Sequence, residues 1–250
     1  MPIIKSATKF LASFIFTTTL SLLIISVTLA EITSYESMNS IFVSVAGKKV
    51  MGENANNEET YSQLSKYCET NSAVELPAGE EKLEINCADI KSSTPDKLGD
   101  VIASAMFKKI YYKQYSCEFV ECLLQGGENL MVAISSTGNA FFKNSIIYLV
   151  GITLLGAAGV LILAETFAGK LKKFGKDCMS VGVIAFLMLF SDIILPKFVP
   201  AESMEGMSGV LSMVTNTMAM RFLIVFAVGA AIFAIGFIAE RKKILTRKKN

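Results

Sequence analysis

Four stretches of the chain are almost entirely apolar, and each is long enough to cross the hydrocarbon core of a membrane. Each has close to the ~20 residues that a spanning helix needs. A long, more polar segment, Glu31 to Lys143, separates the first stretch from the second. The pattern predicts an integral membrane protein with four spanning helices, which run over Phe10–Ala30, Ser145–Ala164, Met179–Leu195 and Phe222–Ala239.

Basic residues gather on one side of these predicted spans. Half of the 24 Lys and Arg lie before the first span, in the loop Gly169–Lys176 and after Glu240. Short loops rich in Lys and Arg stay in the cytoplasm. We therefore expect a multi-pass protein of the cell membrane with both termini in the cytoplasm and residues 31–143 outside it. Because the charge pattern reports topology, it indicates no nucleic-acid partner.

The predicted organisation follows directly from the spans and the charges. The first span also resembles a signal peptide that ends at Ala30, but its apolar run is longer than the usual ~7–15 residues. We favour an uncleaved signal anchor, and cleavage stays an open alternative. The expected parts are a cytoplasmic N-terminus (1–9), a first span (10–30), an extracytoplasmic domain (31–143), a second span (144–165), a cytoplasmic loop (166–177), a third span (178–196), a short outer loop or interfacial helix (197–218), a fourth span (219–239) and a basic cytoplasmic tail (240–250).

Within 31–143 the pattern indicates a small α+β domain. Helical spacing continues past Ala30 as far as Gly47, and a second helix begins near Thr94, where Thr94 can cap it and Pro95 suits its first turn. The remaining expected elements are a short helix with Tyr61, Leu64 and Tyr67 on one face, a strand over Leu83, Ile85 and Cys87, a strand over Leu130–Ile134, and a turn at Gly138-Asn139.

Four of the five cysteines fall in this segment: Cys68, Cys87, Cys117 and Cys122. An even number of cysteines on an oxidising face predicts two disulfides. Three pairings are open. We favour Cys68–Cys87 with Cys117–Cys122, because each bond closes a local loop.

Few residues could carry chemistry. The chain has no histidine, which excludes Ser-His-Asp and Cys-His sites, and it has no glycine-rich phosphate loop. Cys117 and Cys122 could exchange between dithiol and disulfide, as in a membrane thiol–disulfide oxidoreductase. Their spacing is not the Cys-x-x-Cys of redox centres, so a structural disulfide is favoured. We predict no catalytic, cofactor-binding or metal-binding residues.

One acidic residue lies inside a predicted span. Asp192 is near the outer end of the third span, and Arg221 is at the outer end of the fourth. An ionisable group in hydrocarbon suggests either an ion pair between helices or a transport path. We favour the ion pair, with a transporter or channel as the alternative.

The span order resembles that of claudin-like four-span adhesion proteins, although the chain lacks the tryptophan of their first outer loop. Topology of this kind does not establish function. The sequence favours a non-enzymatic four-helix membrane protein whose disulfide-bonded domain contacts a protein partner or a second copy, or organises the envelope.

Overall fold

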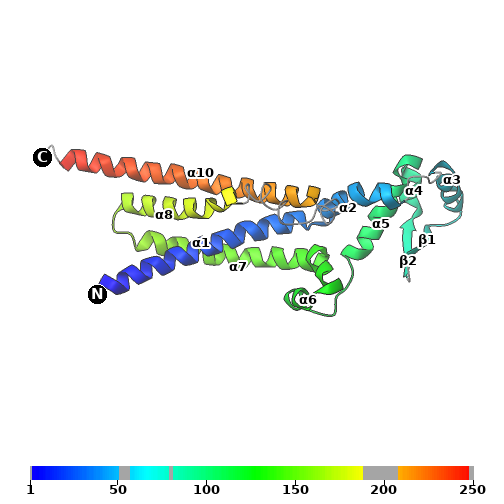
Figure 1. The fold of residues 1–250 in the computed structure, drawn as a ribbon, viewed down its shortest axis with the longest axis horizontal. Helices are drawn as coiled ribbons and strands as arrows, with labels where there is room; N and C mark the ends of the chain where they lie inside the picture. Colours follow the sequence, from blue (N-terminus) through cyan, green and yellow to red (C-terminus); the bar gives the residue numbers. More distant parts are fainter. Residues whose placement is uncertain (1, 51–56, 79–80, 188–207, 248–250) are drawn as a thin grey trace. The chain divides into compact units, whose positions relative to one another are not determined.

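Most of the chain is helical. The computed structural model describes residues 2–50, 57–78, 81–187 and 208–247. Three long helices and one of intermediate length account for most of these residues, and shorter helices with one hairpin lie between the first two long helices in sequence (Figure 1). The four longer helices named here are α1 (Pro2–Ile32), α7 (Ser136–Ile162), α8 (Phe167–Gly182) and α10 (Ser208–Arg247).

Within the described residues, three helices are long and apolar enough to cross a membrane. The candidate spans are Ser6–Ile32, Ser136–Ile162 and Val214–Arg241. The 27 residues of α7 cover ~40 Å, which exceeds the ~30 Å of hydrocarbon in a bilayer. Large apolar side chains on it are uncovered, including Leu155 (74 % exposed) and Ile162 (76 %). Such surfaces are typical of helices in contact with lipid.

The contacts divide the chain into two compact units, which are described separately below. The first, called the helical unit, comprises Met1–Leu29 and Phe142–Asn250. The second, called the disulfide unit, comprises Ala30–Phe141.

In the helical unit, glycines bring α8 and α10 together. A side chain at Gly175 would meet the backbone of Gly229 and Phe233, and one at Gly182 would meet Phe226. Small residues at helix crossings are the usual means of close packing in membranes, where lipid provides no hydrophobic drive for association. Buried clusters also join α1 to its neighbours: Phe16 with Val160 and Cys178, and Ile24 with Val181, Ala185 and Phe222.

Two connecting segments of the helical unit contain helix: the expected cytoplasmic loop (166–177) and the expected short outer loop or interfacial helix (197–218). The segment 166–177 is helical from Phe167, because the Thr166 side chain accepts a hydrogen bond from the Gly169 amide at 3.1 Å and caps α8. In the segment 197–218, α10 already begins at Ser208. Of the predicted third span, residues beyond 187 lie outside the described part of the chain.

The disulfide unit contains one hairpin. Strands β1 (Ala73–Ala78) and β2 (Glu81–Asn86) are antiparallel, with Val74 paired to Ile85 and Leu76 to Leu83. We predicted β2 and missed β1. Alternating residues place one face of the hairpin in a core whose buried members are Cys68, Val74, Leu83, Ile85, Cys87, Ile90, Leu98 and Ile102.

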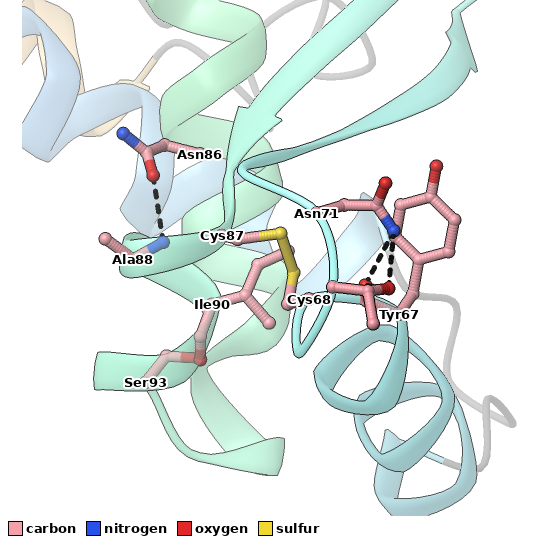
Figure 2. The surroundings of a disulfide bond; sticks show 9 residues. Tyr67, Cys68, Asn71, Asn86, Cys87, Ala88, Ile90 and Ser93 are labelled. Atoms are coloured by element: carbon pink, nitrogen blue, oxygen red, sulfur yellow. Dashed lines mark hydrogen bonds between the residues drawn. A yellow bond between two sulfur atoms is a disulfide. The ribbon is translucent and has the colours of Figure 1, made fainter.

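The disulfide Cys68–Cys87 lies in this core, as Figure 2 shows. It joins the end of α3 (Asn57–Tyr67) to the start of α4 (Cys87–Ser92). Beside it, the Asn86 side chain accepts from the Ala88 amide at 2.9 Å and caps α4. The second disulfide, Cys117–Cys122, closes a loop at α6 (Phe119–Gln125). Both bonds favoured from local spacing are therefore formed.

The helix predicted near Thr94 begins as a short 3-10 turn, η1 (Pro95–Lys97), and continues as α5 (Leu98–Tyr111). The Thr94 hydroxyl does not cap the backbone. A hydrogen bond with the Thr94 side chain instead holds the pKa of Asp96 below its ordinary value. Against α5 packs α2 (Tyr35–Val50), which is separated from α1 by Thr33 and Ser34. The predicted continuous helix past Ala30 is thus interrupted there.

Two local predictions in the disulfide unit are wrong. Leu130–Ile134 is not a strand but part of a 3-10 helix, η2 (Gly127–Ile134). The described sheet contains only β1 and β2, so a strand here would have left its backbone groups unpaired. Gly138 and Asn139 are not a turn but lie in the first turn of α7, which Ser135 caps through its hydroxyl and the Gly138 amide.

Asn139 is the centre of a buried hydrogen-bond cluster. Its side-chain amide donates to the Ala30 carbonyl at 2.6 Å and to the Thr33 hydroxyl at 3.1 Å. The Tyr111 hydroxyl donates to the Thr33 carbonyl at 3.0 Å, and burial raises the pKa of that phenol. These bonds hold together the end of α1, the end of α5 and the start of α7.

We expect Asn139→Ala to lower the unfolding free energy of the disulfide unit by about 1–3 kcal/mol. The substitution removes the hydrogen-bond donor of the buried Ala30 carbonyl and Thr33 hydroxyl. Asn144→Ala is the matched control, since Asn144 is exposed on the same helix. Native-state hydrogen exchange of the protein in detergent measures both. Equal effects of the two substitutions would contradict the proposed importance of the cluster.

The two disulfides should contribute unequally. Replacing Cys68 and Cys87 by Ala opens a loop with a separation of 19 residues, and we expect a loss of ~3 kcal/mol. Replacing Cys117 and Cys122 opens a loop with a separation of only 5, with an expected loss of ~2 kcal/mol. Thermal unfolding of the two double variants measures which of them loses more stability. A larger loss in the Cys117/Cys122 variant would show that loop length does not determine the contribution of each disulfide.

Candidate functional site

A groove in the disulfide unit is the best candidate for a binding site. Its volume is about 1160 Å³, above the ~300–1,000 Å³ usual for small-molecule pockets. One face of η1 and α5 forms its floor, and β2 and α2 contribute its walls. The floor residues recur every three or four positions: Lys97, Val101, Ala105, Lys108 and Tyr112.

The groove follows the outer edge of β2. Five consecutive residues of this strand, Lys82 to Asn86, line it, whereas β1 contributes only Ala73. Side chains of consecutive residues point to opposite faces of a strand. A groove that touches all of them therefore runs beside the backbone, along the edge that β1 does not cover.

Two hydrogen bonds show which backbone groups of β2 face this groove. The Cys87 amide donates to the Ser72 carbonyl at 2.9 Å, so odd-numbered residues pair with the β1 side. The Lys82 carbonyl accepts from Lys109 Nζ at 2.8 Å, so even-numbered residues point outward. Because pairing alternates along an antiparallel ladder, the Glu84 amide and carbonyl also point into the groove.

Charges of both signs surround this edge. Lys82 forms an ion pair with Glu75 at 2.6 Å, and this hydrogen bond together with the Coulomb attraction raises the pKa of Lys82. Glu84 pairs across the hairpin with Glu75. Of the described residues, none forms a salt bridge with Glu84 within 4 Å. The two carboxylates of Glu75 and Glu84 lie opposite each other, which is unfavourable. Of the two, only Glu75 forms an ion pair with a described lysine.

The α2 wall adds a polar atom without a partner. Oδ1 of Asn39 is buried and accepts no hydrogen bond from the described protein atoms, and Asn39 lines the groove. A buried amide oxygen without a partner is unusual in a folded protein, and this one belongs to a residue of the groove wall.

The predicted cysteine site lies elsewhere in this unit. Cys117 and Cys122 do not line the groove, and they are joined as a disulfide in which Cys122 is fully buried. The fifth cysteine, Cys178, is a buried free thiol of α8. The four cysteines predicted to form disulfides are thus brought together in two separate pairs.

The predicted intramembrane pair is only half described. Asp192 lies outside the described residues, and Arg221 lies in α10, beside the buried Phe222. The ion pair between them stays a prediction.

The helical unit contains a polar cluster that the sequence pattern did not predict. The Asp177 carboxylate is buried and binds Lys173 Nζ at 2.8 Å through Oδ1, while its Oδ2 has no partner among the described protein atoms. Lys173 Nζ also donates to the Ser13 hydroxyl of α1 at 2.7 Å. The spacing of Lys173 and Asp177 on one helix face was the available signal, but burial and the contact with Ser13 depend on tertiary packing.

Within the described residues, no group of three or more His, Cys, Asp or Glu side chains is arranged to hold a metal ion. Comparison of the chain with protein-family models, with curated proteins and with solved structures gives no match.

We expect Lys173→Met to destabilise the helical unit by about 1–3 kcal/mol, because it leaves the Asp177 carboxylate buried without a cation. The loss should be below that of a fully buried pair, since the Lys173 side chain is 40 % exposed. Reversible unfolding in mixed micelles measures it.

Two further variants test the physical reason for that loss. Lys176→Met removes an exposed lysine of the same helix and should change stability by less than ~0.5 kcal/mol. Lys173→Met combined with Asp177→Leu should recover part of the stability, because no unpaired charge remains. If the double variant is less stable than Lys173→Met, the Asp177 carboxylate is not the cause.

Proposed function

We propose that this chain is a four-span membrane protein, without enzymatic activity, that presents the disulfide unit outside the cytoplasm as a binding module for a partner protein. The groove along β2 is the observation that carries the proposal. Its size, its exposed position on the unit and its backbone groups without partners are properties of a protein-binding surface rather than of a reaction centre.

The cysteines support the predicted orientation. Disulfides form and persist in oxidising compartments, and both bonds lie in the unit between the first two candidate spans. Half of the 24 Lys and Arg lie in three short segments, which are the N-terminus, the loop Gly169–Lys176 and the tail after Glu240, and this favours a cytoplasmic location for both termini. The helical unit then serves as the membrane anchor, with a third span that includes residues 178–196.

The Cys117–Cys122 disulfide offers less support for a thiol–disulfide oxidoreductase. Exchange requires a thiolate to reach one of the two sulfur atoms. Cys122 is fully buried and Cys117 is half-buried, and neither cysteine belongs to a Cys-x-x-Cys motif, which is the arrangement that lowers a thiol pKa for exchange. We therefore assign this bond a structural role at the start of α6.

Site-directed photo-crosslinking in the native host tests the proposed binding surface. With a benzophenone amino acid at Lys108, on the groove floor, we expect a discrete crosslinked complex of the chain with a second protein. The same amino acid at Lys66, which is exposed on α3 and does not line the groove, should give no such complex. Complexes of equal yield from both positions, or none from Lys108, would contradict the groove as the binding surface.

Labelling of intact cells is the control for orientation. A membrane-impermeant amine reagent should modify lysines of the disulfide unit and leave the lysines after Glu240 unmodified until the cells are opened. Labelling of the tail alone would invert the topology, and the proposed extracytoplasmic role would then be wrong.

A further inference from the structure

We propose, on the basis of the binding function proposed above, that the outer edge of β2 binds an extended segment of the partner as an additional antiparallel strand, and that this segment places a basic residue opposite Glu84 with an apolar residue on either side of it. The juxtaposition that carries the proposal is an uncovered strand edge beside a groove whose floor includes the apolar residues Val101 and Ala105. Strand addition of this kind obtains affinity from main-chain hydrogen bonds and specificity from alternate side chains.

The edge of β2 has the groups that an added strand requires. The amides of Lys82, Glu84 and Asn86 point away from β1 by the alternation of the ladder. The Lys82 carbonyl is already bound by Lys109, and Asn86 is the last residue of β2, directly before α4. Glu84 therefore offers both an N–H and a C=O, and one residue of an antiparallel strand can bind both.

The opposite edge of the hairpin is less suited to this role. By the same alternation, Ala73, Glu75 and Pro77 of β1 point outward. Proline has no N–H, and its presence on an edge strand prevents pairing with another chain. The two edges of this hairpin therefore differ: β1 is protected and β2 is open.

The charges around Glu84 determine the chemistry of the partner. Glu84 lies opposite Glu75, whose charge Lys82 already compensates. A residue of the added strand opposite Glu84 shares its exposed face, and a basic side chain there is favoured. The preceding and following residues point to the other face, on the side of Leu83, Ile85 and α5. The floor there includes Val101 and Ala105, so apolar side chains fit.

Binding of synthetic peptides to the full-length protein in detergent tests this mode. The probe is a fluorescein-labelled peptide of sequence Ser-Val-Lys-Val-Lys-Val-Ser, and fluorescence anisotropy measures its affinity. Methylation of the two Lys backbone nitrogens should weaken binding about tenfold, because it removes the donors that face β2. Methylation of two Val nitrogens, which face away, should leave the affinity unchanged within about twofold. Equal effects of the two methylations would overturn strand addition.

Matched proline variants test which edge binds. Glu84→Pro deletes an outward N–H without removing a bond to β1, and it should weaken binding of the Lys peptide about tenfold. Glu75→Pro makes the same change on the β1 edge and should have no effect beyond about twofold. Intact disulfides and an unchanged circular dichroism spectrum verify that both variants fold. Loss of binding in Glu75→Pro but not in Glu84→Pro would show that the peptide pairs with β1, and the proposed β2 edge would then be wrong.

A charge exchange tests the side-chain chemistry. Glu84→Lys should shift the preference from the Lys peptide towards Ser-Val-Glu-Val-Glu-Val-Ser by about fivefold, and an unchanged preference would overturn the basic specificity. Failure of strand addition is distinguishable from failure of the proposed function. If the peptide tests fail while Lys108 still crosslinks to a partner, the groove binds that partner by another mode.

Discussion

The disulfide unit depends on the buried hydrogen bonds that connect Asn139 to the last turn of α1. Ala30 lies in the last turn of α1 and Asn139 in the first turn of α7, and the bond between them spans 109 positions of sequence. Thr33 accepts from both Asn139 and Tyr111, so the same residues end α1 and hold the end of α5. A buried polar group is costly without a partner, and each member of this cluster therefore constrains the others.

The two units are stabilised by different means. In the helical unit, glycines such as Gly175 and Gly229 allow α8 and α10 to approach, while large apolar side chains stay uncovered. Close packing then replaces the hydrophobic effect, as is usual for helices in lipid. In the disulfide unit, a small core surrounds Cys68–Cys87, and a crosslink compensates for the limited area that so few residues can bury. The chain thus combines close helix packing, which suits lipid, with a small disulfide-linked core, which suits water.

The candidate binding surface exists because α5 packs against the hairpin core on one side and against α2 on another. Its residues Leu98 and Ile102 belong to the core with the hairpin, and its ring of Phe107 packs with Tyr35 and Phe42 of α2 at centroid distances of 5.9 and 5.3 Å. The remaining face of α5, between these two contacts, is left as the groove floor. Since the hairpin has only two strands, the edge of β2 beside that floor lacks a neighbour. An open edge of this kind is either protected or used, and here only β1 carries a proline.

The sequence by itself determined the features that depend on local physics. Hydropathy located the three candidate spans in the helices α1, α7 and α10. The short loop between Cys68 and Cys87 favoured the pairing that the structure contains. Helical spacing also located α3 and α5. Leu130–Ile134 was mistaken for a strand because a short apolar run suits either a strand or a buried helical turn, and the absence of a partner strand decides between them. Tertiary structure alone decided the burial of Asn139 and Asp177, the pairing of β1 with β2 and the direction of the Glu84 backbone groups. These depend on contacts between residues far apart in the sequence, whose energies no local pattern contains.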